Sequence, residues 1–141
     1  MQRKATARWQ GTAKEGKGSI STQSGTLHDT PYSFIARFGD GKGTNPEELV
    51  AGAHAACFTM ALSFMLNNAG FTADALDTEA SLTMDQVAGA WTITAIHLTT
   101  RGRVPKIDAA KFAEVASDAK ANCPISRLLN ATITMDAKLV A

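Results

Sequence analysis

The chain has 141 residues, with 14 Lys and Arg against 13 Asp and Glu, which gives a formal net charge of +1. This length suits one core, so we expect residues 1–141 to form a single domain. The basic residues are not concentrated anywhere, which argues against nucleic-acid binding and against a polybasic membrane patch. The charged start, MQRKATARWQ, lacks an apolar segment with a cleavage site, so we expect a cytoplasmic protein.

The first part of the chain is predicted to form three strands. Residues 4–12 and 17–24 alternate in polarity and are separated by glycines, which indicates two strands joined by a turn. Residues 31–38, PYSFIARF, are predicted to form the third strand. Arg37 would then lie among apolar neighbours on a strand.

A glycine-rich loop, GDGKGTN, leads into a long predicted helix. Asn45 suits the N-cap, Pro46 the first helical position, and Glu48 the third position as a capping-box partner. The helix is expected to run to about Asn68, with Gly70 ending it.

The rest of the chain is predicted to form a β-hairpin, two helices and a last strand. In chain order these are strands 76–87 and 90–101 with Ala88-Gly89 at the turn, a helix over 108–121, a short helix after Pro124 and a strand over 131–140. Because strands and helices do not alternate, the order indicates an α+β fold with mainly antiparallel pairing.

The segment 49–66 has no formal charge over 18 residues, which is long enough to raise the possibility of a membrane span. We reject a span because the segment is mostly alanine with embedded polar residues and has no Lys or Arg at its ends. A helix that is apolar on all sides must be buried on all sides. One sheet covers only one side, so we predict a homodimer with these helices near its centre.

The two cysteines occupy different settings. In a reducing compartment they are expected to be catalytic, redox-sensing or simply buried rather than a permanent bridge. Cys57 lies well inside the helix, so it needs a nearby cation to become a thiolate; otherwise it is a small buried hydrophobe. Cys123 precedes Pro124 at a helix N-cap, where backbone N–H groups stabilise a thiolate. The residues alone leave open which thiol attacks.

His54 lies three residues before Cys57 and shares its side of the helix. The pair is half of a zinc site, but the only other candidates are His28, His97 and Cys123, without a metal-binding spacing. We therefore interpret His54 as a core histidine or a wall of a pocket.

Three charged residues have ordinary explanations as well as functional ones. Glu47 and Glu48 complement the helix dipole in the first turn and need no other reason. Arg37 could equally be an arginine that extends its charge to solvent.

The segments GKGTNPEELVAGAHAACFTMALSFML and KANCPISRLL together resemble the OsmC/Ohr family of osmotically inducible and organic hydroperoxide resistance proteins, in particular its OsmC branch. The resemblance covers nearly the whole chain, from ARWQG and KGSISTQSG to ITMDAKL. It implies α+β subunits with mainly antiparallel sheets around a long buried central helix, assembled as an intertwined homodimer. It also implies a thiol peroxidase without metal or flavin, which reduces organic hydroperoxides, and hydrogen peroxide less well.

The resemblance assigns roles to four residues by their motifs. Cys57 of AAC corresponds to the thiol that attacks peroxide, and Cys123 of NCP to the thiol that resolves the sulfenic acid as a disulfide. Glu47 corresponds to the acid of NPE, and Arg37 of the ARF strand to the arginine of the OsmC branch. The expected substrate pocket is lined by the residues His54, Phe58, Met60, Ala61 and Phe64.

These roles imply a chemistry. Arg37 would hold Cys57 as a thiolate and bind the peroxide, while Glu47 would orient the guanidinium. An external dithiol, such as a lipoyl group on a lipoylated protein, would reduce the disulfide. Glu47 and Cys57 are ten residues apart, about 15 Å along a helix, so we expect the acid and the arginine to reach a given Cys57 partly from the other subunit.

Two alternatives use the same residues differently. The protein could be a redox sensor or a small-molecule binding stress protein that forms the disulfide but does not turn over fast. It could also be a purely structural stress protein whose thiols stay inert toward peroxide.

Overall fold

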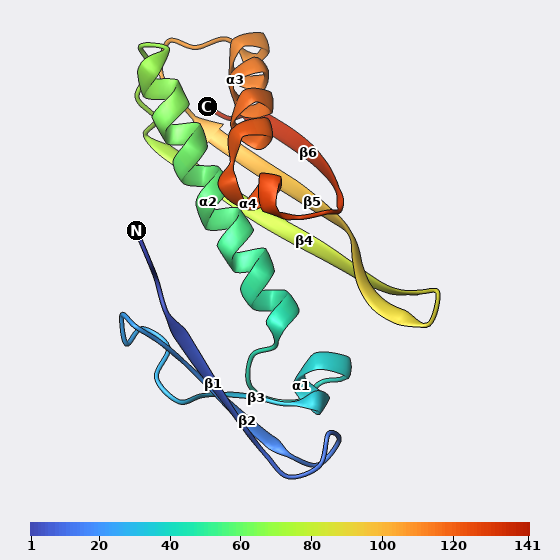
Figure 1. Ribbon diagram of the computed structural model, residues 1–141. Helices are drawn as coiled ribbons and strands as arrows, with labels where there is room; N and C mark the ends of the chain where they lie inside the picture. Colours follow the sequence, from blue (N-terminus) through green and yellow to red (C-terminus); the bar gives the residue numbers. More distant parts are fainter. The chain divides into compact units, whose positions relative to one another are not determined.

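The computed structural model describes residues 1–141. The chain forms two compact units, residues 1–49 and 50–141, so the expectation of a single domain stays a prediction. The elements in chain order are β1 (Ala5–Gln10), β2 (Lys17–Thr22), β3 (Thr30–Tyr32), α1 (Phe34–Phe38), α2 (Pro46–Asn68), β4 (Ala75–Val87), β5 (Ala90–Arg103), α3 (Ala109–Asn122), α4 (Pro124–Leu128) and β6 (Thr132–Leu139) (Figure 1). The predicted α+β class is confirmed.

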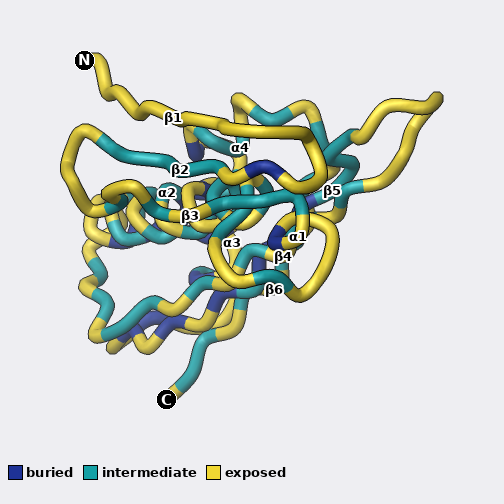
Figure 2. Tube along the Cα trace, turned by 90° about the horizontal axis from the view of Figure 1, so that it is seen from below, coloured by how far each residue is buried: buried dark blue, intermediate teal, exposed yellow.

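The first unit contains a three-stranded antiparallel sheet with the order β1-β2-β3. The rings of Trp9 and Tyr32 lie 5.5 Å apart between their centroids. A Cβ atom at Gly18 would come within 2.5 Å of the Tyr32 ring and 2.8 Å of the Trp9 ring, so only glycine fits between them. β1 is exposed along its whole length (Figure 2).

The predicted strand over residues 31–38 is wrong beyond its second residue. β3 ends at Tyr32, and Ser33 caps the short helix α1 by accepting a hydrogen bond from the Ala36 N–H at 3.0 Å. The alternation of apolar residues indicated a strand, but a serine that caps a turn outweighs β propensity over so short a segment. Arg37 therefore lies on a helix.

Both predicted ends of α2 are confirmed. Asn45 Oδ1 accepts a hydrogen bond from the Glu48 N–H at 2.8 Å, which satisfies one free donor of the first turn. The Glu48 carboxylate accepts from Thr44 Oγ1 at 3.2 Å instead of completing a capping box. Gly70, with φ of 86°, stands where the chain leaves the helix.

The second unit contains a sheet with the order β4-β5-β6. β4 and β5 form the predicted antiparallel hairpin, with Ala88 and Gly89 both at positive φ in the turn. β6 instead pairs with β5 in parallel, because α3 and α4 carry the chain back between these strands. The pairing is thus mainly antiparallel with one parallel pair.

The main core lies in the second unit, between one face of this sheet and the helices α2 and α3. The predicted helix over 108–121 is present as α3, and it buries one apolar stripe that consists of Phe112, Val115, Ala116 and Ala119. The fully buried apolar side chains from α2 and β5 are Phe58, Leu62, Leu66, Ile96 and Leu98.

Only one side of α2 is buried within one chain. Its buried residues recur every four positions from His54 to Leu66, whereas Met60 is 74% and Phe64 66% exposed. By length and composition alone α2 could cross a membrane. Its buried side packs against the sheet of the second unit, while the rest of its apolar surface is uncovered within one chain.

Candidate active site

The structure brings the two cysteines together. Cys57 is half-buried on α2, and Cys123 is fully buried at the junction of α3 and α4, where it is the N-cap of α4. Both are free thiols, and the two side chains are close enough to share a hydrogen bond. Two thiols this close can exchange a proton or join as a disulfide without a large movement of either helix.

The surroundings of Cys57 raise its pKa above the ordinary value for a thiol. Burial is the largest cause, because it disfavours the charged thiolate, and the neighbouring Cys123 raises the pKa further. The backbone N–H of Ile125 acts in the opposite direction by donating a hydrogen bond to the sulfur. None of these groups is a cation, so Cys57 needs an additional positive charge to be a thiolate at neutral pH.

His54 lies one helical turn before Cys57 and is completely buried. Its Nε2 is 2.8 Å from Ser126 Oγ of α4, while its Nδ1 has no hydrogen-bond partner. Burial lowers the pKa of His54, so the ring is neutral at neutral pH. No group of three or more His, Cys, Asp or Glu side chains in the chain could hold a metal ion.

The apolar residues expected in the substrate pocket lie in two different environments. Phe58 belongs to the buried core, and Ala61 is half-buried against it. Met60 and Phe64 are exposed and follow Cys57 by three and seven residues, so they lie on the same side of α2. Their role as a pocket wall stays a prediction.

Arg37 and Glu47 form a two-pronged ion pair within the first unit. Arg37 Nε donates to Glu47 Oε1 at 3.1 Å and to Oε2 at 3.0 Å, and Arg37 Nη2 donates to Oε1 at 2.6 Å. The guanidinium also lies 5.1 Å from the centroid of the Phe38 ring. The Glu47 side chain is only 16% exposed, whereas the Arg37 side chain is 35% exposed, so water screens the pair mainly from the arginine side. The expected contact between these two residues is therefore present, while their catalytic roles stay predictions.

Two residues of α4 belong to the site although sequence patterns did not indicate them. Ile125 and Ser126 contact Cys57 and His54, respectively, and both follow Cys123 within the CPIS segment. The available signal was the spacing: Ser126 follows Cys123 by three residues, as Cys57 follows His54. Such a match becomes meaningful only when the two helices are known to face each other.

A chain of threonines fixes α2 to the sheet close to Cys57. Thr59 Oγ1 lies 2.8 Å from Thr78 Oγ1 of β4, which lies 3.0 Å from Thr100 Oγ1 of β5. Thr100 is fully buried, so these bonds are sheltered from water. They hold the sulfur-bearing turn of α2 in register with the strands.

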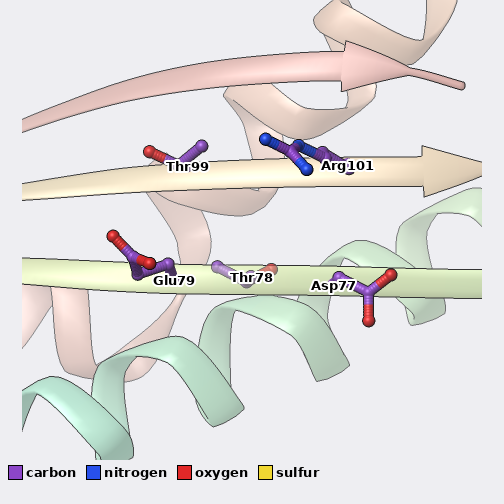
Figure 3. Close-up of a pocket in the computed structure, with 5 residues that line it drawn as sticks. All are labelled: Asp77, Thr78, Glu79, Thr99 and Arg101. Carbon is purple, nitrogen blue, oxygen red and sulfur yellow. The ribbon is translucent and has the colours of Figure 1, made fainter.

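A separate hollow of about 330 Å³ lies on β4 and β5. Figure 3 shows its lining, which consists of Asp77, Thr78, Glu79, Thr99 and Arg101. The lining contains no sulfur and carries charges of both signs. The hollow is thus distinct from the thiol site.

The fold and the paired free thiols define a two-cysteine redox protein of the α+β class. The family described as OsmC-like protein matches residues 39–138, and the chain belongs to this family. The chain is 50% identical to the peroxiredoxin OsmC of Escherichia coli (strain K12) over 139 residues, covering 99% of this chain and 97% of the relative. These comparisons assign it to the peroxiredoxin-like thiol peroxidases.

Solved structures agree with the assignment. The organic hydroperoxide resistance protein OhrB of Bacillus subtilis has a TM-score of 0.74 and 28% identity, covering 98% of both chains. An OsmC-like protein of unknown function from Vibrio cholerae has a TM-score of 0.81 with 12% identity, covering 97% of this chain and 99% of that chain, which shows the shared fold alone.

Proposed function

We propose that the protein reduces organic hydroperoxides to alcohols, and hydrogen peroxide to water less well, through a cycle of Cys57 and Cys123. The observation that carries the proposal is the contact between these two free thiols, one on α2 and one at the N-cap of α4. The relatives named peroxiredoxin and organic hydroperoxide resistance protein support a peroxide as the substrate.

The proposed cycle has three steps. The Cys57 thiolate attacks one peroxide oxygen, the O–O bond breaks, and the other oxygen leaves as an alkoxide that takes up a proton to give the alcohol. Cys57 is left as a sulfenic acid, and the Cys123 thiol condenses with it to a disulfide while the sulfenic hydroxyl leaves as water. An external dithiol, such as a lipoyl group, reduces the disulfide by exchange and is itself oxidised.

Arg37 supplies the missing charge in this proposal. Burial and Cys123 keep Cys57 protonated, so a permanent cation is needed to favour the thiolate and to stabilise the leaving oxygen. Glu47 binds the guanidinium by three contacts and thereby holds it in one orientation. A preorganised donor stabilises developing charge better than a mobile one.

The exposed side of α2 supports a homodimer, and in the proposal the Arg37–Glu47 pair acts partly across its interface. Met60 and Phe64 expose large apolar side chains next to Cys57, which is unfavourable in water unless another surface covers them. A second copy would cover them and leave an apolar space near the sulfur. An alkyl tail of the substrate then gains about 0.8 kcal/mol for each CH₂ group that it buries.

A peroxide-consumption assay with a dithiol reductant tests the proposal. We expect Cys57→Ser to abolish turnover, whereas Cys123→Ser consumes one equivalent of peroxide and accumulates a sulfenic acid, read by mass spectrometry after trapping. Full turnover by Cys57→Ser would refute the assignment. A disulfide that forms with peroxide but is not reduced by any dithiol would favour the alternative, a cytoplasmic redox sensor.

A further inference from the structure

The contacts between α2 and α4 form two matched pairs. Cys57 of α2 contacts Cys123, and His54 of α2 contacts Ser126 of α4. On each segment the two members are three residues apart, which is close to one helical turn. The thiol contact and the His54–Ser126 hydrogen bond are therefore neighbouring contacts along one helix–helix seam.

α4 is a short helix, and besides the His54–Ser126 bond it is held by Ile125, which packs against the core and whose N–H donates to Cys57, and by the buried Cys123 at its N-cap. It has five residues, none of them fully buried, and a helix this short is not stable in isolation. Cys123 at its N-cap makes no side-chain cap hydrogen bond. The His54–Ser126 bond is anchored on the long helix α2 and adds a directional polar restraint to these contacts.

The burial of the His54 side chain lowers the free energy of unfolding. Its Nδ1 is buried and has no partner, a loss that an aliphatic side chain of similar size would avoid. Its pKa is lowered by burial, so it does not offset this loss by carrying a charge at neutral pH. The polar interaction that the ring does make is the 2.8 Å bond to Ser126. That bond accounts for a histidine at this position.

We infer that His54 is a positioning residue for the second step of the cycle, in which its hydrogen bond to Ser126 keeps α4 against α2 so that Cys123 can reach the sulfenic acid on Cys57. The inference rests on the proposed function. The step joins the two sulfurs, and the Cys123 proton leaves with the sulfenic hydroxyl as water. If α4 moves away, the sulfenic acid persists and a second peroxide oxidises it irreversibly to the sulfinic acid.

The sulfenic acid on Cys57 therefore has two competing fates that can be measured, disulfide formation with Cys123 and further oxidation to the sulfinic acid. For each variant, rapid mixing with one equivalent of cumene hydroperoxide gives the rate of Cys57 oxidation and the rate of disulfide formation, both followed by quenching and mass spectrometry. With excess peroxide, the sulfinic acid fraction reports the competing reaction. The ratio of the two rates separates a defect in resolution from a general loss of activity.

Ser126→Ala and Ser126→Thr form a matched pair, since only the second keeps the hydroxyl. We expect Ser126→Ala to slow disulfide formation relative to Cys57 oxidation by about five- to tenfold, the size of one lost hydrogen bond, and to raise the sulfinic acid fraction. Ser126→Thr should retain the wild-type ratio. His54→Gln keeps an amide that can hydrogen-bond to Ser126. Its ratio of disulfide formation to Cys57 oxidation should therefore be closer to that of the wild type than the ratio of His54→Leu.

A double-mutant cycle completes the test. If the two residues act through one bond, His54→Leu combined with Ser126→Ala should be no slower in resolution than the worse single variant. Thermal unfolding of each variant identifies any that fail to fold. An unchanged ratio in folded Ser126→Ala would overturn the inference, whereas wild-type protein in which Cys57 is never oxidised would overturn the proposed function instead.

Discussion

Arg37 and Glu47 are joined by three hydrogen bonds, two from Nε and one from Nη2, so the guanidinium plane is held against the carboxylate. The pair links α1 to the first turn of α2. Because the carboxylate occupies only one edge of the guanidinium, the orientation of the remaining donors is also set.

Glu47→Gln is expected to lower kcat/KM for an organic hydroperoxide by about tenfold or more, because hydrogen bonds to charged groups contribute roughly 1.5–3 kcal/mol. Arg37→Lys should have a similar effect, since an ammonium group cannot form the two-pronged contact with the Glu47 carboxylate. Glu48→Gln is the matched control, as this neighbouring acid accepts a hydrogen bond from Thr44 Oγ1. Steady-state peroxide consumption provides the measurement, and a Glu47→Gln enzyme as active as Glu48→Gln would contradict the expectation.

The pH dependence of Cys57 reactivity should show whether Arg37 lowers the pKa of this thiol. Burial raises the pKa of Cys57 above its usual value of 9.0, which lowers the thiolate fraction at neutral pH. In Arg37→Met, alkylation of Cys57 should therefore keep increasing up to and beyond pH 9.0. Under the proposed function the Arg37 guanidinium favours the thiolate in the wild type, so the wild-type midpoint should lie at lower pH.

Iodoacetamide labelling with peptide mapping gives both profiles for Cys57 separately from Cys123. Superimposable profiles would mean that Arg37 does not ionise the attacking thiol.

The exposed apolar side of α2 should be a dimer interface. Phe64 is 66% exposed on this side, and Phe64→Glu would place a charge in an apolar contact, which is costly without a partner. We expect this variant to sediment as a monomer and to lose peroxidase activity. Val87→Glu, at a residue that is 49% exposed beside the hairpin turn, serves as the control and should leave the wild-type assembly unchanged. A Phe64→Glu protein that sediments like the control would locate the interface elsewhere.

Gly102 in β5 is expected to be intolerant of a side chain. A Cβ atom there would lie 2.5 Å from two atoms of the Phe112 ring in α3. Gly102→Ala should reduce the free energy of unfolding by about 1–3 kcal/mol through overpacking. Chemical denaturation measures the loss. In a Phe112→Leu background the same change should cost less because the clash is relieved, and equal costs in both backgrounds would argue against a steric cause.

Local patterns were sufficient for most of the elements. Asn45, Pro46 and Gly70 mark the ends of α2 by chemistry that acts within a few residues, so these bounds were predictable. The Ala88-Gly89 turn was predictable for the same reason. The segment 31–38 was not, because its alternating apolar residues and its capping serine indicate different structures, and the balance between them is a matter of a few tenths of a kcal/mol per residue.

Sequence patterns pointed to the chemistry of the thiols, the long apolar helix and the need for a cation, since these follow from residue type and spacing. They could not show that β6 runs parallel to β5, that Ile125 donates to Cys57, or that His54 binds Ser126 across 72 residues. Those relationships depend on how distant segments pack into one core. Burial and distance, which arise only when the chain has folded, decide them.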